Sequence, residues 1–150
     1  MDLSDEILVP ASREIVYRAL NDPDILKACI PGCEELTKSS DTELQAKILL
    51  KIGPVKARFA GTVTLDPVGA PERFTLAGQG NGGAAGFAKG GAEVELEDRG
   101  DETLLRYKAN ADIGGKIAQL GSRLVQSTSK KLSGQFFQRF SEKVVDGGKV

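Results

Sequence analysis

The sequence predicts a single α+β domain, with a curved antiparallel sheet of about seven strands wrapped around a long C-terminal helix. Three observations support this fold class. Apolar and polar residues alternate with period two between about residues 44 and 113, and after Gly115 the apolar spacing changes to three and four. The length of 150 residues is that of one ordinary domain, so residues 1–150 are expected to fold as one unit.

The first 30 residues predict one strand and two short helices. The apolar run within Asp5–Pro10 ends at a proline and is typical of a strand. Ser12 is a good N-cap for a helix over Arg13–Asn21, whose apolar residues share one face. The pair Asp22-Pro23 ends that helix and starts a second one over Asp24–Ile30.

The middle of the chain predicts an antiparallel meander. In its first strand Leu44, Ala46 and Ile48 face one way, while the intervening side chains are mostly polar. Gly53-Pro54 and Asp66–Gly69 are turn sequences. The strands are expected near residues 44–52, 55–65, 73–79, 89–97 and 103–113.

A helix is expected from Gly115 to about Val145, with Asp146–Gly148 ending it. Gly121 and Gly134 weaken it by about 1 kcal/mol each, so each is expected to mark a bend or a close approach. This helix is the only element large enough to cover the apolar face of the sheet. The sheet must therefore curl around it, which is a helix-grip architecture.

Small residues at the inward positions of the later strands suggest a hydrophobic cavity. These positions are Gly78, Gly80, Ala88, Gly90, Ala92, Ala109 and Ala111. They either let the helix approach closely or leave a hollow, and we favour the hollow. The expected lining is Leu50 (or Leu49), Phe59, Phe74, Leu76, Phe87, Gly90, Tyr107, Ala109, Leu120, Leu124 and Phe136. Tyr107 is the main polar residue of this lining, so a hydrophobic, uncharged ligand fits the cavity best.

Two further patterns have structural interpretations. Gly78–Gly83 matches G-x-G-x-x-G, but no helix follows it, so a flexible hairpin at the cavity mouth is expected and not a nucleotide site. Glu93, Glu95, Glu97 and Asp98 alternate on one strand and are expected to face outward.

Composition excludes several functional classes. Without histidine there is no Ser-His-Asp or Cys-His relay and no common zinc site. The net charge of −1 argues against nucleic-acid binding. Cys29 and Cys33 are interpreted as small apolar residues, not a redox pair or metal site. With no signal peptide or membrane span, a cytoplasmic location is expected, peripheral to the inner face of the membrane if docking occurs.

Charge is uneven along the chain: residues 1–35 carry a net −5 and residues 115–150 a net +5. The basic residues of the C-terminal helix belong either to a solvated face or to a surface for an anionic membrane or an acidic partner. The candidates for such a surface are Arg123, Lys130, Lys131 and Arg139.

The opening of the chain, Ser12–Tyr17 with Asn21–Pro23 and Ile30–Glu34, is similar to that of START-like helix-grip (SRPBCC) ligand-binding domains. Three later segments narrow the resemblance to the CoxG family of carbon monoxide dehydrogenase proteins: Gly53–Gly61, the glycine-rich Gly78–Gly91 and Gly114–Gly121. The resemblance implies a non-catalytic protein that binds a lipid or respiratory quinone and tethers a molybdenum hydroxylase to the membrane. Many members carry a C-terminal anchoring extension, and none is expected within these 150 residues.

Three functional hypotheses follow. The leading one is a carrier or accessory protein without cofactor of its own, holding a hydrophobic small molecule such as an isoprenoid quinone. The second is a ligand-free assembly factor that docks through its basic helix. The third is a cyclase- or hydrolase-like enzyme using Tyr107 with Glu34 or Asp112 for proton transfer.

Overall fold

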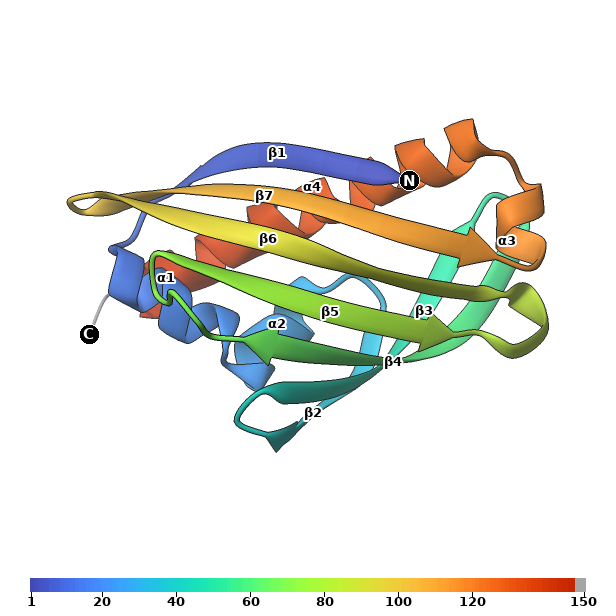
Figure 1. Ribbon diagram of the computed structural model, residues 1–150, viewed down its shortest axis with the longest axis horizontal. Coiled ribbons are helices and arrows are strands. Elements are labelled where there is room, and N and C mark those ends of the chain that lie inside the picture. Colours follow the sequence, from blue (N-terminus) through green and yellow to red (C-terminus); the bar gives the residue numbers. More distant parts are fainter. Residues whose placement is uncertain (148–150) are drawn as a thin grey trace.

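A computed structural model describes residues 1–147 and shows one seven-stranded sheet curved around a C-terminal helix (Figure 1). The strands are β1 (Asp2–Val9), β2 (Cys33–Ser40), β3 (Glu43–Ile52), β4 (Val55–Asp66), β5 (Arg73–Asn81), β6 (Phe87–Arg99) and β7 (Glu102–Gly114). The helices are α1 (Arg13–Leu20), α2 (Pro23–Cys29), η1 (Gly83–Ala85), α3 (Lys116–Gln119) and α4 (Ser122–Gly147). The predicted fold class is therefore confirmed.

The sheet is antiparallel throughout, in the order β1-β7-β6-β5-β4-β3-β2. Each strand from β3 to β6 pairs with the next, which is the meander that the alternation predicted. The first strand lies at one edge of this sheet, because β1 pairs with β7 along its whole length from Asp2 to Val9. That pairing extends the first strand three residues before the predicted Asp5.

The pattern of alternation does not predict β2. The residues of this strand are mostly exposed and polar, and only Leu36 is a half-buried apolar residue in its middle. Such an edge strand is held by its pairing with β3 and not by an apolar face of its own, so its sequence carries little alternation.

The two short helices form as predicted and pack under one end of the sheet (Figure 1). The Asp22 carboxylate caps α2 by accepting hydrogen bonds from the backbone N–H groups of Asp24 and Ile25. Ser12 holds the extended N-cap conformation before α1, but its side chain makes no capping hydrogen bond.

The predicted helix over residues 115–145 is divided in two. Gly121 has a φ of +98°, which breaks the helix between α3 and α4 and explains this glycine as a bend. Gly134 is exposed on α4, and an added Cβ would meet no atom within 4 Å, so it marks neither a bend nor a close approach. The helix was predicted to end at Asp146–Gly148; the described part of α4 extends to Gly147, and Gly148 lies outside the described residues.

Two apolar clusters lie between the sheet and the helices. The larger joins α1, α2, the middle strands and the C-terminal half of α4, with Phe140, Leu96 and Leu105 almost fully buried. The smaller lies at the opposite end and contains Ile52, Phe59, Ala85 and Ile117. We call that end the tip; it consists of the β3–β4 turn, the β5–β6 connection with η1, and α3 (Figure 1).

Candidate ligand-binding cavity

A cavity of about 340 Å³ lies next to the larger cluster, between the inner face of the sheet, the α1–α2 junction and the middle of α4. Most of its wall is aliphatic or aromatic. The apolar lining consists of Leu20, Leu26, Ile30, Leu36, Leu44, Ala46, Ile48, Val63, Leu65, Phe74, Leu76, Ala92, Val94, Leu105, Phe136 and Phe137. This size and character are those of a small-molecule pocket.

The cavity has a deep side and an open side. On the deep side, Phe74, Val94 and Leu105 are at most 7% exposed. On the other side the lining includes the exposed, charged side chains of Lys38 and Asp41, from the β2–β3 hairpin. The cavity therefore opens between this hairpin and the α1–α2 junction, and the mouth is polar while the interior is apolar.

One hydroxyl pair interrupts the apolar wall. The Tyr107 and Ser133 oxygens are 2.7 Å apart and form a hydrogen bond between β7 and α4. The Tyr107 ring stacks on Phe137, with centroids 5.5 Å apart, which holds the phenol in place. Because each hydroxyl carries one hydrogen, one O–H is used within the pair and the other can donate to a third acceptor.

The structure brings together only part of the predicted lining. Phe74, Leu76, Tyr107 and Phe136 line this cavity. The four residues Leu50, Phe59, Leu120 and Leu124 belong instead to the smaller cluster at the tip. Leu50 and Phe59 lie in the halves of β3 and β4 that end at the β3–β4 turn, and Leu124 lies against Gly53 in that turn. The break at Gly121 separates α3 from α4 and leaves Leu120 at the same end of the sheet.

The remaining predicted lining residues lie elsewhere. Phe87 is 51% exposed on the outer face, because strand alternation places it opposite to Ala88. Gly90 and Ala109 lie beyond the cavity wall, and a Cβ on Gly90 would come within 2.0 Å of the Asn110 carbonyl oxygen. A close backbone approach between β6 and β7 therefore explains Gly90. The alternative residue Leu49 pairs with Arg58 and shares its strand face with Lys47 and Lys51, not with the inward side chains.

Several lining residues were not among the predicted ones. Leu44, Ala46 and Ile48 share the inward face that the alternation of β3 identified, so their pattern could have named them. Leu20, Leu26 and Ile30 reach the cavity through the packing of α1 and α2 under the sheet, which no local pattern reveals.

Small inward residues continue beyond the cavity, and two of them are not packed against the helix. We call Gly78, Gly80, Ala88, Gly90, Ala109 and Ala111 the small-residue strip; all six are half-buried. A Cβ added to Gly80 would meet nothing closer than the Ala60 carbonyl oxygen at 3.9 Å, and one on Gly78 would contact only Val63 and Thr62. No atom of α4 approaches these two glycines, which favours a hollow over close helix packing at this part of the strip.

The comparison with known proteins identifies the family. The family model for CoxG, a subunit of carbon monoxide dehydrogenase, matches residues 6–145. The chain belongs to the CoxG family. No curated relative matches it.

Solved structures similar to this CoxG family member share its START-like helix-grip fold. A conserved protein from Geobacillus kaustophilus has a TM-score of 0.90 and 26% identity, covering 97% of this chain and 96% of that one. A START superfamily protein from Mycobacterium smegmatis has a TM-score of 0.72 and 16% identity, covering 97% of each chain. The Zhui aromatase/cyclase from Streptomyces sp. R1128 has a TM-score of 0.71 and 10% identity, covering 96% and 93%. At such low identity the last two show the fold alone.

The carboxylates predicted to work with Tyr107 lie away from it. Glu34 is exposed and accepts a hydrogen bond from Arg58 at 2.9 Å. Asp112 is exposed and shares the outward face of β7 with Asn110, whereas Tyr107 faces inward. The proposed partner of Tyr107 in proton transfer is therefore wrong, and its observed partner is Ser133.

The two cysteines are free thiols, and Cys29 is fully buried. Burial raises the pKa of both thiols above the ordinary value, so neither is activated as a thiolate. Among the residues that the structure describes, no group of three or more acidic or cysteine side chains could hold a metal ion. The glycine-rich Gly78–Gly83 segment runs from β5 into the three-residue η1 at the tip, so it does not lie at the cavity mouth as predicted.

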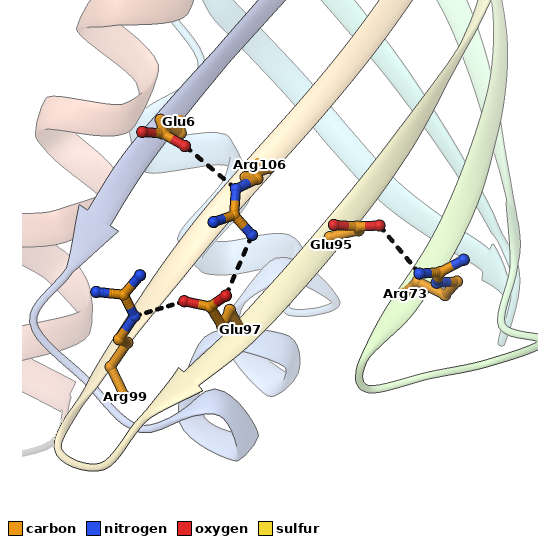
Figure 2. Close-up of polar contacts among 6 residues, drawn as sticks. All are labelled: Glu6, Arg73, Glu95, Glu97, Arg99 and Arg106. Atoms are coloured by element: carbon orange, nitrogen blue, oxygen red, sulfur yellow. Dashed lines mark hydrogen bonds and ion pairs between the residues drawn. The ribbon is translucent and has the colours of Figure 1, made fainter.

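Two of the acidic residues of β6, Glu95 and Glu97, face outward and form ion pairs (Figure 2). Glu97 bonds Arg99 and Arg106, and Arg106 also donates to Glu6 at 3.2 Å. Arg73 donates to Glu95 at 3.0 Å. The hydrogen bond from Arg99 lowers the pKa of Glu97. Exposed pairs like these contribute little to stability, and they confirm a surface instead of an acid–base site.

The four cations predicted as a docking surface are all exposed: Arg123, Lys130, Lys131 and Arg139. No helix of the described residues is long and apolar enough to cross a bilayer.

Proposed function

We propose that this CoxG family member is a non-catalytic carrier that holds a lipid or isoprenoid quinone in its cavity and couples a molybdenum hydroxylase to the membrane. The observation that carries the proposal is the apolar cavity with one hydroxyl pair in its wall. Such a wall stabilises an uncharged ligand by burial, and it offers no charged group at its deep side to drive proton transfer.

The size of the cavity limits how much ligand it takes. A cavity of about 150 Å³ holds one benzene, so 340 Å³ accommodates on the order of 14 heavy atoms. That corresponds to an unsubstituted benzoquinone ring with its first isoprene unit. The rest of a long tail would lie outside, either through the mouth beside Lys38 or along the small-residue strip.

The hydroxyl pair would orient the ligand. The O–H of Tyr107 or Ser133 that remains available can donate to a quinone carbonyl oxygen. Phe136 and Phe137 flank the pair and offer their rings to a flat head group. This arrangement favours a head-inward orientation, with the aliphatic part toward the mouth.

The partner follows from the family. The family description names carbon monoxide dehydrogenase, so the partner is proposed to be a molybdenum hydroxylase of that type. Two electrons and two protons from the molybdenum hydroxylase would reduce the bound quinone to the quinol. In this role the chain supplies a binding site, and the redox chemistry belongs to the enzyme and the quinone.

Native mass spectrometry of gently purified protein, followed by organic extraction, tests the proposal. A bound isoprenoid quinone or lipid near one equivalent is the expected result. An empty protein that also fails to take up added quinone would contradict it and favour the ligand-free assembly factor, whose docking would then depend on α4.

Pull-down of the purified molybdenum hydroxylase separates these two functions. An assembly factor would keep its partner after the cavity is filled and lose it when Lys130 and Lys131 are reversed in charge. A carrier would bind its ligand equally well in the charge-reversed variant.

A further inference from the structure

The tip of the molecule combines an exposed aromatic side chain with unpaired positive charge. Phe87 is 51% exposed, and its ring lies over Gly114, where a Cβ would come within 2.4 Å of it. Five exposed cations lie at the same end: Lys51, Lys56, Lys89, Lys116 and Arg123. None of them takes part in the ion pairs found among the described residues.

The contacts of the backbone bring these residues to one end. Lys51 and Lys56 are cross-strand partners beside the β3–β4 turn. An added Cβ on Gly53 in that turn would meet Leu124, next to Arg123, at 2.8 Å. Figure 1 shows the β3–β4 turn, the β5–β6 connection and α3 at the same end of the sheet.

Phe87 and Lys89 complete this surface on the outer face of β6. They point to the same side because they are two residues apart on a strand. The backbone of Gly86 lies against Gly115, where an added Cβ would come within 2.5 Å of the Gly86 Cα, and Lys116 follows directly. One acidic side chain lies on the same face, because Asp112 is the cross-strand partner of Lys89.

The β6–β7 hairpin, at the opposite end of the sheet, has a net negative charge. It carries exposed Asp98, Asp101 and Glu102 against one exposed cation, Arg99, which bonds Glu97. An anionic surface would therefore attract the tip and repel this hairpin.

We infer that the tip is the surface that docks on an anionic lipid bilayer, with Phe87 entering the interface and the surrounding cations meeting lipid phosphates. Each basic side chain near such a surface strengthens binding about five-fold, and an exposed aromatic ring is suited to the headgroup region. The inference rests on the membrane coupling included in the proposed function and states which face performs it. It also places the small-residue strip, which lies on β5, β6 and β7 between the cavity-lining residues and the tip, between the bilayer and the cavity.

Co-sedimentation of the full chain with vesicles of phosphatidylcholine containing about one-third phosphatidylglycerol tests the inference. Replacing Lys89 and Lys116 by glutamine should weaken binding about 30-fold, since each lysine contributes about five-fold. The matched control replaces Lys130 and Lys131 by glutamine, which removes the same charge from the exposed side of α4. Control binding should stay within about three-fold of wild type.

Phe87→Ser gives an independent readout. It should weaken binding even in high salt, where the contribution of the lysines is screened. Equal losses in the two lysine pairs, or a larger loss in the control, would overturn the assignment of the tip. An unchanged Phe87→Ser variant would overturn the insertion of this side chain.

Quinone binding measured without vesicles separates this inference from the proposed function. Wild-type protein that binds quinone but ignores anionic vesicles contradicts the inference alone. If it instead binds the purified molybdenum hydroxylase through Lys89 and Lys116, the tip is a protein-docking surface and the lipid assignment is wrong. Vesicle binding through the tip without quinone binding supports the inference and contradicts the carrier function.

Discussion

Replacing Ala92 by leucine tests whether the cavity is a real hollow. Ala92 lies on β6 in the wall of the cavity, opposite Leu76 on β5 and Ala109 on β7. Three added carbons fill about 75 Å³, if benzene in a 150 Å³ cavity sets the volume per atom. Because empty core volume costs about 24 cal/mol per Å³, the substitution should stabilise the fold by up to about 1.8 kcal/mol.

Thermal unfolding of delipidated protein measures this effect. For a chain of 150 residues, about 1.8 kcal/mol corresponds to a rise in Tm of roughly 4–7 °C. The same variant should bind a quinone at least about ten-fold more weakly, because the cavity would take about three fewer heavy atoms. Stability and binding would thus change in opposite directions.

Ala19→Leu is the matched control. Ala19 is 2% exposed in the packed cluster around α1, so the same three carbons should overpack the core and cost about 1–3 kcal/mol. If Ala92→Leu destabilises the protein as much as Ala19→Leu, the space beside Ala92 is already filled and the reasoning is refuted.

Four further predictions concern single residues. Gly80→Leu should change the free energy of unfolding, measured in urea, by less than about 1 kcal/mol. Gly90→Leu should lower the same free energy by about 3 kcal/mol or more, because it drives a Cβ into a backbone carbonyl. Gly134→Ala should stabilise by about 1 kcal/mol by the same measurement, because the added methyl meets only open space on a helix; no gain would indicate a contact there. Tyr107→Phe should weaken quinone binding up to about ten-fold but leave a hydrocarbon of similar shape unaffected in calorimetry, and equal losses would contradict a hydrogen bond to the carbonyl. The raised pKa of Cys33 should make its alkylation at pH 8 slower in the folded than in the unfolded protein, and equal rates would contradict this. Because the unfolded chain loses this proton at a lower pH than the folded one, the free energy of unfolding should fall as the pH rises above about 8.5.

The alternation of the strands predicted the fold and most of the inward faces correctly. Because side chains of a strand point to opposite faces in turn, Phe74, Leu76 and Tyr107 could be assigned to the interior from the sequence alone. The same rule excludes Phe87 from the interior, since its parity differs from that of Ala88. The large aromatic side chain of Phe87 favours burial, but its position on the strand decides which face it occupies.

The other differences between the predicted and the observed lining of the cavity arise from tertiary packing. A glycine in a helical pattern is compatible with a continuous helix or with a break, and only the positive φ of Gly121 decides between them. Leu120 and Leu124, on either side of that break, pack against the smaller cluster at the tip and not in the cavity. The contribution of α1 and α2 to the cavity wall depends on where they pack under the sheet, which their own sequences do not specify.

Calorimetric titration of delipidated protein with a quinone that carries a single isoprene unit tests the central claim most directly. The account predicts one site in the wild-type protein and an affinity at least about ten-fold lower in Ala92→Leu, because this ligand matches the volume of the cavity. No binding by the wild-type protein, or equal binding by both proteins, would contradict the assignment of the cavity as the ligand site.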